Sequence, residues 1–479
     1  MCFGVSLNWQ VKSYLIWFKL QNQKIMPQSQ GSRFFELTQT TTLHGLRSTT
    51  SVSKNRLQRG IWIIFLLISI TLFYYLMYKD LTRYFSYNVT TLQQYQEATF
   101  LELPSITICN HNLVRKSYIN KLSQENLGQV FKFFTPYFAQ AKLDTLKILQ
   151  TITENNVNSQ NLENIGRDGA HQFDEMILLL KIGQTLKTYP DGIHKSRFTQ
   201  GGYCHTIHPK SFIDKYGSIK INRAGIKGGV AMLVNISEND YFASVEGSSG
   251  LKILVHAPYD EPLMNEVSLS IPPGSHVKIM IQKKEIIDLP FPYGSSHCVD
   301  TESDSFMNPL KLYGVYSYNA CTMECLVNYL WMQCGCRLLF YHTPKVPVCN
   351  AEQTLLCAIN ATVTYYDTFS LEAACDCHHR CHKTKFAASI SLSHFPSKDL
   401  DYEHVTNRSI VDDKLSFVNI FYGELGTEVL HQVPSYPFEA AFGEIGGQLG
   451  ICLGASVLTL IEFIEFFTIS CCICARRKT

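Results

Sequence analysis

Two glutamates, Glu462 and Glu465, stand in an apolar stretch that also contains the small residues Gly454, Ala455 and Ser456. An ionised carboxylate at bilayer depth is unfavourable unless it faces protein or water. Carbonyl groups that a break in a membrane helix releases can replace part of an ion's hydration shell. This combination predicts a helix that lines a narrow cation path. Enzyme motifs such as a nucleophile elbow, HExxH or a P-loop do not occur in the sequence, so no enzymatic activity is expected.

The helix that would carry these residues needs a break. At about 100° per residue, one face of a continuous helix would hold Gly443, Gly447, Gly450, Gly454 and Glu465. Ser456 would point nearly the opposite way, so a path that includes Gly454 to Ser456 requires non-helical backbone there. Such backbone is tolerated at membrane depth only where it lines a cavity or is buried in protein. The alternative is that the small residues form the packing face of a helix pair.

Two stretches are long and apolar enough to cross a membrane, residues 61–78 and about 445–474. Basic residues precede the first stretch and follow the second: Arg47, Lys54, Arg56, Arg59, Arg476, Arg477 and Lys478. The positive-inside rule then places both termini in the cytoplasm and the intervening residues outside the cell. The net charge of +2 gives no indication of a nucleic-acid partner.

The predicted domains are a cytoplasmic region (1–59), a first transmembrane helix (60–80), an extracellular domain (81–433), a pre-pore segment with a second transmembrane helix (434–474) and a cytoplasmic tail (475–479). Twelve of the 17 cysteines lie in the extracellular part, which predicts a disulfide framework. Ten of them fall within 298–381. A metal site at Cys334–Cys336 or Cys375–Cys377 is the less favoured alternative, because zinc sites prefer CxxC spacing. Glycosylation sequons occur at Asn88, Asn235, Asn360 and Asn407.

The extracellular domain is expected to mix helices and strands. A polar, helix-prone region covers about 113–195, and helical spacing recurs at 321–333. Strands are predicted at 101–109, 229–234, 250–256, 267–271, 276–281, 387–393 and 415–422. Residues 272–274 (PPG) form a turn between two of them. The fold class is therefore a membrane protein of α+β type, with two membrane helices around a disulfide-rich extracellular domain.

The ordered motifs resemble the degenerin/epithelial sodium channel family, most closely its acid-sensing and peptide-gated branches. The segments that carry the resemblance are His44–Gly45, LPSITICN (103–110), GYCHTI (202–207), PPG (272–274), LPFPYG (289–294), the cysteine pattern of 298–381 and GEIGGQLGICLGAS (443–456). The resemblance implies a trimer of identical or related subunits in the plasma membrane, with a palm, finger, knuckle and thumb outside. It implies a sodium-selective pore that is often blocked by amiloride, with Na+ as the permeant ion and no cofactor.

The resemblance also implies a role for individual residues. It identifies the selectivity filter as Gly454, Ala455 and Ser456, and the pore and gate residues as Gly443, Glu444, Gly447, Gly450, Glu462 and Glu465. His44 and Gly45 match a gating pair, and Tyr87 and Tyr293 match the aromatic residues that couple the extracellular domain to the membrane. The implied disulfides, with the last five as a ladder in the thumb (298–381), are Cys109–Cys204, Cys298–Cys381, Cys321–Cys377, Cys325–Cys375, Cys334–Cys357 and Cys336–Cys349.

The stimulus is the least determined property. Acid-sensing members carry aspartates just after the cysteine that matches Cys357, whereas the corresponding stretch here, 358–369, contains only Asp367 as an acidic residue. Two carboxylates held close together can share a proton and sense pH. An extracellular peptide is therefore the preferred stimulus, followed by protons and then by constitutive or mechanical opening. Alternatives from other classes are an ATP-gated two-span channel and a non-conducting surface receptor.

Overall fold

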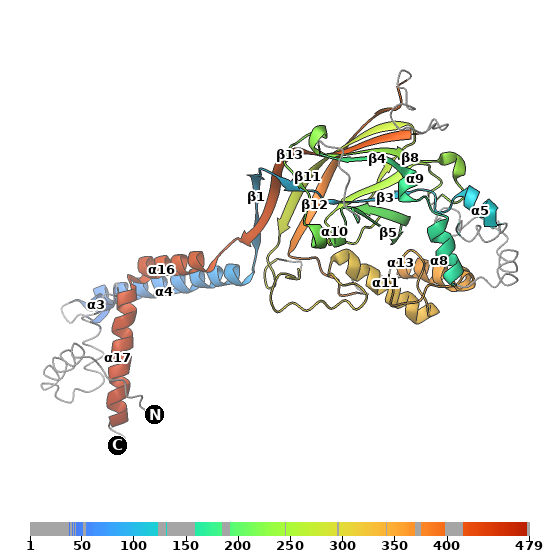
Figure 1. Ribbon diagram of the computed structural model, residues 1–479. Coiled ribbons are helices and arrows are strands. Elements are labelled where there is room, and N and C mark those ends of the chain that lie inside the picture. Colours follow the sequence, from blue (N-terminus) through green and yellow to red (C-terminus); the bar gives the residue numbers. More distant parts are fainter. Residues whose placement is uncertain are drawn as a thin grey trace, which may run out of the picture. The chain divides into compact units, whose positions relative to one another are not determined.

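The computed structural model divides the chain into two units, residues 1–89 with 434–479 and residues 90–433. The structure describes residues 54–122, 159–183, 192–244, 246–294, 297–341, 343–368, 375–397 and 415–476, together with 38, 41, 43, 45–50 and 131. The first unit contains the apolar helices, and the second contains the sheets and the cysteine-rich helices (Figure 1).

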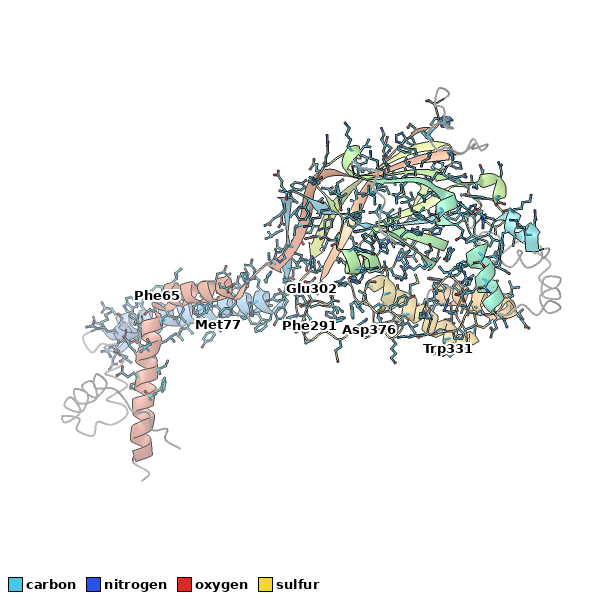
Figure 2. The ribbon with its side chains drawn as sticks, in the orientation of Figure 1. Phe65, Met77, Phe291, Glu302, Trp331 and Asp376 are labelled. Atoms are coloured by element: carbon cyan, nitrogen blue, oxygen red, sulfur yellow. A yellow bond between two sulfur atoms is a disulfide. The ribbon has the colours of Figure 1, made fainter. Side chains whose placement is uncertain are left out.

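The helices of the first unit are α3 (Leu46–Thr50), α4 (Arg56–Phe85), α16 (Phe438–Leu453) and α17 (Val457–Arg476). By length and hydropathy, α4 can cross a membrane. Its outward side chains are apolar, and Phe65, labelled with Met77 in Figure 2, is 59% exposed. The helices α16 and α17 pass the same test as a pair and are bent by 77° at a short break. A bent pair of this kind is either a broken span or a re-entrant loop.

A six-stranded sheet forms one layer of the second unit. Its strands are β1 (Val89–Glu97), β4 (Ile177–Ile182), β8 (Val230–Asn235), β11 (Ser275–Ile287), β12 (His382–His394) and β13 (Leu415–Pro434). The order is β12-β11-β13-β8-β4, with β1 also on β13, and β11 runs parallel to β13. Alternate residues of β11, Val277, Ile279 and Ile281, are at most 2% exposed, which is the period-2 pattern of a strand with one buried face.

A five-stranded sheet forms the other layer. Its strands, in spatial order, are β10 (Leu269–Ile271), β9 (Leu251–His256), β3 (Ser105–Asn110), β6 (Gly202–Ile207) and β5 (His194–Thr199). Every residue of the central strand β3 is buried. A single apolar cluster joins side chains from both sheets, including Ile106 of β3 and Ile279 of β11. A short pair, β2 (Leu101–Glu102) with β7 (Lys220–Ile221), completes the strands described.

Short helices surround these sheets, and longer helices form the cysteine-rich part. The short elements are α5 (Lys116–Leu122), α8 (Ser159–Asp168), α9 (Phe173–Met176), α10 (Lys210–Tyr216), η2 (Ile226–Gly228) and η3 (Glu238–Asp240). The cysteine-rich elements are α11 (Tyr318–Cys334), α12 (Ala351–Gln353), the π-helical turn η4 (Thr354–Ala358) and α13 (Ile359–Thr368). Helix α11 begins where the Ser317 hydroxyl accepts the amide of Ala320, and it ends at Gly335 with φ of 69°.

Most of the predicted strands are confirmed, some with longer bounds. The PPG turn is confirmed too, but the strands on either side of it belong to different sheets, so the turn connects the two layers. The helix-prone assignment of 113–195 is wrong in part, because Ile177–Ile182 forms β4 and β5 begins at His194. The segment ILLLKI is rich in leucine, which favours helices locally, but pairing with β8 and burial against the core outweigh that preference.

Candidate functional site

The predicted break in the second apolar segment is present between α16 and α17. Gly454 adopts the left-handed conformation with φ of 65° and ψ of 18°, and its amide donates to the carbonyl of Gly450 at 2.8 Å. The amide of Ala455 donates to the carbonyl of Leu449 at 3.4 Å. Glycine occupies this conformation without the clash that a Cβ causes, and it commonly ends helices in this way. The sequence therefore ends α16 at Leu453 by a local backbone preference.

Ser456 starts the next helix through a reciprocal pair of hydrogen bonds. The Ser456 hydroxyl accepts the amide of Thr459 at 3.4 Å, and the Thr459 hydroxyl accepts the amide of Ser456 at 3.1 Å. This is the arrangement of a capping box, with threonine in place of the usual glutamate or glutamine. Thr459 is 2% exposed, whereas Ser456 is exposed, so the pair lies at the edge of the unit. Gly454 to Ser456 thus form a short non-helical connection between a glycine-terminated helix and a capped helix start.

The glycines of α16 point away from the helix that packs against it. In the described part of the chain, an ideal Cβ added to Gly443, Gly446 or Gly447 meets no atom within 4 Å outside its own helix backbone, and one added to Gly450 meets only the carbonyl oxygen of Ala455, at 3.8 Å. At about 100° per residue, this glycine face lies roughly opposite the face that carries Ala441 and Gln448. Within this subunit, the glycines therefore do not form the packing face against α4 that the alternative interpretation requires.

The three predicted pore acids have different surroundings. Glu444 accepts a hydrogen bond of 2.6 Å from the hydroxyl of Tyr436, a residue that is 6% exposed. Glu462 is partly buried, and its Oε2 atom has no hydrogen-bond partner among the described residues. Glu465 is exposed on α17. The structure thus bonds Glu444 to Tyr436 just before α16, leaves one oxygen of Glu462 buried without a partner among the described residues, and exposes Glu465.

Sequence reasoning did not single out Asp80, which the structure places on the inward face of α4. Its carboxylate accepts a hydrogen bond from the Gln448 side chain of α16, and it is 7% exposed. The signal was available: Asp80 follows the buried Phe73 by seven residues, two helical turns along the same stripe. The charge lies just beyond the uncharged run of 61–78, so a search for charges within that run passes over it.

The other predicted coupling residues lie in separate parts of the structure. Gly45 has φ of 83°, and its carbonyl accepts the amides of Ser48 and Thr49 at the start of α3. An ideal Cβ at Gly45 would meet Trp62 and Leu66 of α4 at ordinary contact distance, so this turn lies against α4. His44 lies outside the described residues. Tyr87 contacts the Tyr84 ring in the first unit, and Tyr293 belongs to the second unit.

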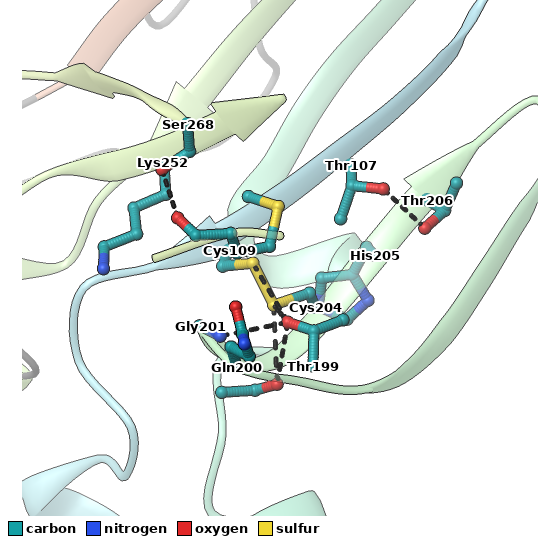
Figure 3. The surroundings of a disulfide bond; sticks show 12 residues. Thr107, Cys109, Thr199, Gln200, Gly201, Cys204, His205, Thr206, Lys252 and Ser268 are labelled. Atoms are coloured by element: carbon teal, nitrogen blue, oxygen red, sulfur yellow. Dashed lines mark hydrogen bonds between the residues drawn. A yellow bond between two sulfur atoms is a disulfide. The ribbon is translucent and has the colours of Figure 1, made fainter. Parts of the chain in front are cut away.

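The second unit contains disulfides at the six pairs that the resemblance implies. The pairs are Cys109–Cys204, Cys298–Cys381, Cys321–Cys377, Cys325–Cys375, Cys334–Cys357 and Cys336–Cys349. Figure 3 shows the first of these beside Thr199, whose hydroxyl accepts the amide of Gly201 at 3.2 Å. Because the cysteines of the alternative metal sites are all joined in disulfides, they offer no thiolate to a metal.

Three of the four glycosylation sequons lie in the described part. Asn88 and Asn360 are exposed, and Asn235 is half-buried at the end of β8, where its side-chain oxygen accepts the amide of Ser237. Asn407 lies outside the described residues.

A cavity of about 340 Å³ opens in the second unit between the five-stranded sheet and the start of α11. Arg197 of β5 forms an ion pair of 2.8 Å with Glu261 at its wall. The neighbouring Asp260 has no such ion pair among the described residues, and burial raises its pKa to about 6. His256 also lines the cavity, where its ring bonds to Thr107 and to the Ala257 carbonyl, and burial lowers its pKa to about 4.

Comparisons with known proteins agree with this architecture. A protein-family model described as "Amiloride-sensitive sodium channel" matches residues 37–466. Acid-sensing ion channel 1 of Gallus gallus is 26% identical over 452 residues, covering 89% of this chain and 81% of that protein. Acid-sensing ion channel 2 of Homo sapiens is 25% identical over 447 residues, covering 89% and 84%.

The structural alignment with a solved proton-activated chloride channel covers 86% of this chain and 97% of the chloride channel chain. Its TM-score is 0.32 and the sequence identity is 8%, and these two values are too low to support an argument. The family model spans nearly the whole chain, and it leaves the ATP-gated alternative without support. The chain belongs to the amiloride-sensitive sodium channel family.

Proposed function

We propose that the chain is a pore-forming subunit of a sodium-selective channel in the plasma membrane, in which the α16–α17 segment lines the conduction path. The observation that carries this proposal is the break at Gly454–Ser456 beside a glycine face that no other described helix covers. A helix pair that serves only for packing requires neither a break in the helix nor an uncovered glycine face.

The proposed ion path has three parts. Gly443, Gly447 and Gly450 form the gate region, because a helix without side chains on one face can approach its symmetry mates closely. Carbonyl groups at the break, Gly454–Ser456, form the selectivity filter, since non-helical backbone can present carbonyl oxygens to an ion. Below the filter, Glu462 and Glu465 favour cations, and Glu444 does so at the outer mouth.

The membrane arrangement follows from the same proposal. The helix α4 forms the first span, the bent pair forms the second, and both termini lie in the cytoplasm. Three identical or related subunits surround the pore, with the second unit outside the cell. Gly45 and the neighbouring His44 act on the gate from the cytoplasmic side, and Tyr87 and Tyr293 transmit movement of the extracellular domain.

The proposed stimulus is a small extracellular peptide. Helix α13 carries Asp367 as its single acidic residue, so it offers no pair of carboxylates to the rest of the cysteine-rich part. The cavity beside α11 is lined by charges of both signs and by the ring of Tyr313, which suits a small peptide that carries charged groups of both signs. The charged lining residues are Lys195, Arg197, Lys210, Asp260 and Glu261.

Protons are the second candidate, and Asp260 is the observation that favours them. A carboxylate whose pKa is about 6 changes charge in the pH range that an extracellular acid sensor must read. The buried histidines are less suitable, because burial lowers the pKa of His171 and His205 to about 4.

Voltage clamp of oocytes that express the chain tests the proposal. We expect an inward sodium current, blocked by amiloride, on exposure to peptides, to acid, or after a bulky substitution at Gly443. Asp260→Asn distinguishes the two stimuli. If protons open the channel at this carboxylate, the substitution should shift or abolish the response to acid. If a peptide opens it, the response to peptide at constant pH should become weaker but persist. If no condition gives sodium current from channels that reach the surface, the chain does not conduct as a homomer.

A further inference from the structure

The inward face of α4 carries apolar residues with one charged residue near each end, Arg59 and Asp80. The stripe that faces the inside of the unit runs through Leu66, Phe73, Leu76 and Met77 to Asp80. Phe73 is 8% exposed and Asp80 is 7% exposed, although most of this helix is open. A carboxylate buried at the end of a membrane helix is unfavourable without a partner, and such residues commonly mark functional contacts.

The partner of Asp80 lies on α16. The Nε2 atom of Gln448 donates to the Oδ2 atom of Asp80 at 2.6 Å, which is a short, charge-assisted hydrogen bond. Gln448 lies on the face of α16 that is roughly opposite the glycines. Its Oε1 atom is buried and has no hydrogen-bond partner among the described residues. The amide of Gln448 is therefore oriented by Asp80.

A second polar contact joins the same two helices nearer to their outer ends. The guanidinium of Arg83 lies over the ring of Tyr436 at 4.5 Å, and the hydroxyl of Tyr436 donates to Glu444. Arg83 and Glu444 lie about one helical turn from Asp80 and Gln448 respectively. If α16 slid or rotated on α4, the Asp80–Gln448 hydrogen bond or the Arg83–Tyr436 contact would be lost.

We propose that Asp80 is a positioning residue whose hydrogen bond to Gln448 couples α4 to α16 and sets the orientation of the glycine face, and with it the balance between the conducting and non-conducting states. The inference rests on the proposed function, because it assigns Asp80 to the gate of the same pore. Rotation of α16 turns Gln448 and the glycines together, since both are fixed to one helix. Any such rotation has to exchange or break the bond to Asp80.

A cross-link in intact cells tests the contact without any current. The full chain carries Asp80→Cys with Gln448→Cys, and Cys452→Ser removes a free thiol that lies on the same face of α16. A protease site replaces the exposed turn around Asn222 and Arg223, which no native disulfide crosses. After oxidation and cleavage, the two fragments should stay joined on a non-reducing gel. The matched control, Asp80→Cys with Gly446→Cys, should separate.

Single-channel recording tests the effect on gating. In a background of Gly443→Val, which the proposed function expects to conduct, Asp80→Ala and Gln448→Ala should each change the ratio of open to closed time in the same direction, by about 3- to 30-fold. The double variant should change the ratio no more than the larger single effect. Asp80→Asn should change it least, because asparagine can still accept from Nε2 and can donate to Oε1. Surface biotinylation corrects each current for the amount of protein at the membrane.

The cross-link tests the Asp80–Gln448 contact, and the single-channel recording tests its effect on gating. Fragments that separate as readily as in the control would overturn the Asp80–Gln448 contact whether or not the channel conducts. Additive effects in the double variant, or equal effects of Asp80→Asn and Asp80→Ala, would overturn the coupling. Absence of current in every variant, with the cross-link present, would overturn the proposed function and also the role of Asp80 in gating, while leaving the contact itself established.

Discussion

Gly454→Ala is the substitution that addresses the break in the second apolar segment most directly. Gly454 has φ of 65°, and a Cβ in this left-handed conformation is unfavourable by about 1–2 kcal/mol. Alanine at this position also favours continuation of α16, since it is a better helix former than glycine by about 1 kcal/mol. Together these terms lower the population of the bent connection by about 30-fold or more.

The assay is the reversal potential of the current with sodium or potassium as the external cation. If carbonyl groups at Gly454–Ser456 select the ion, Gly454→Ala should lower the preference for sodium and the unitary conductance. Gly446→Ala is the matched control, because its added Cβ meets no atom within 4 Å and its backbone is already helical. A Gly454→Ala channel that reaches the surface with the selectivity and conductance of Gly446→Ala would refute the assignment of the break as the filter.

Three further predictions concern the cap, the acid stability and one disulfide. Ser456→Ala should weaken the start of α17 by about 1 kcal/mol and reduce selectivity, whereas Ser456→Thr should preserve both, as reversal potentials will show. His205 is 1% exposed and burial lowers its pKa to about 4, so the stability that the neutral ring contributes is lost as the pH falls from about 6.5 to 4. His205→Gln should therefore remove up to about 3 kcal/mol of the acid-induced loss of stability. Thermal unfolding of the solubilised protein at pH 7 and pH 4.5 measures this loss, and an unchanged pH dependence would contradict the prediction. Replacement of Cys336 and Cys349 by serine should lower the stability of the second unit by about 2–4 kcal/mol, measured in the same way, and an unchanged melting temperature would show that the segment between α11 and α12 holds without this bond.

The sequence was most informative where a feature depends on a few adjacent residues. The break after Leu453 could be predicted because glycine at 454 and serine at 456 are typical of a helix end and a helix start. The strands 250–256 and 276–281 could be predicted because apolar residues of β-branched type recur in short runs. Both signals act within one or two turns of chain, so no knowledge of tertiary contacts is needed.

Features that depend on distant partners could not be derived in this way. The strand β4 is formed because Ile177–Ile182 pairs with β8, about 50 residues away, and its own composition favours a helix. The disulfide pairing followed from the resemblance, since spacing alone leaves the connectivity of twelve cysteines open. Asp80 is explained by Gln448, which lies on the other side of the extracellular domain in the sequence. In each case the partner residue, and not the local pattern, decides the structure.

The two faces of α16 give different information about assembly. The face with Ala441 and Gln448 packs against α4, so its contacts are made within one subunit. Among the described residues, a Cβ added to this glycine face would meet only the Ala455 carbonyl oxygen, yet glycine weakens a helix by about 1 kcal/mol per residue relative to alanine. The four glycines at 443, 446, 447 and 450 therefore reduce the stability of the isolated helix with little gain from contacts among the described residues. The proposed trimeric pore supplies a compensation, because glycines allow the helices of neighbouring subunits to approach closely.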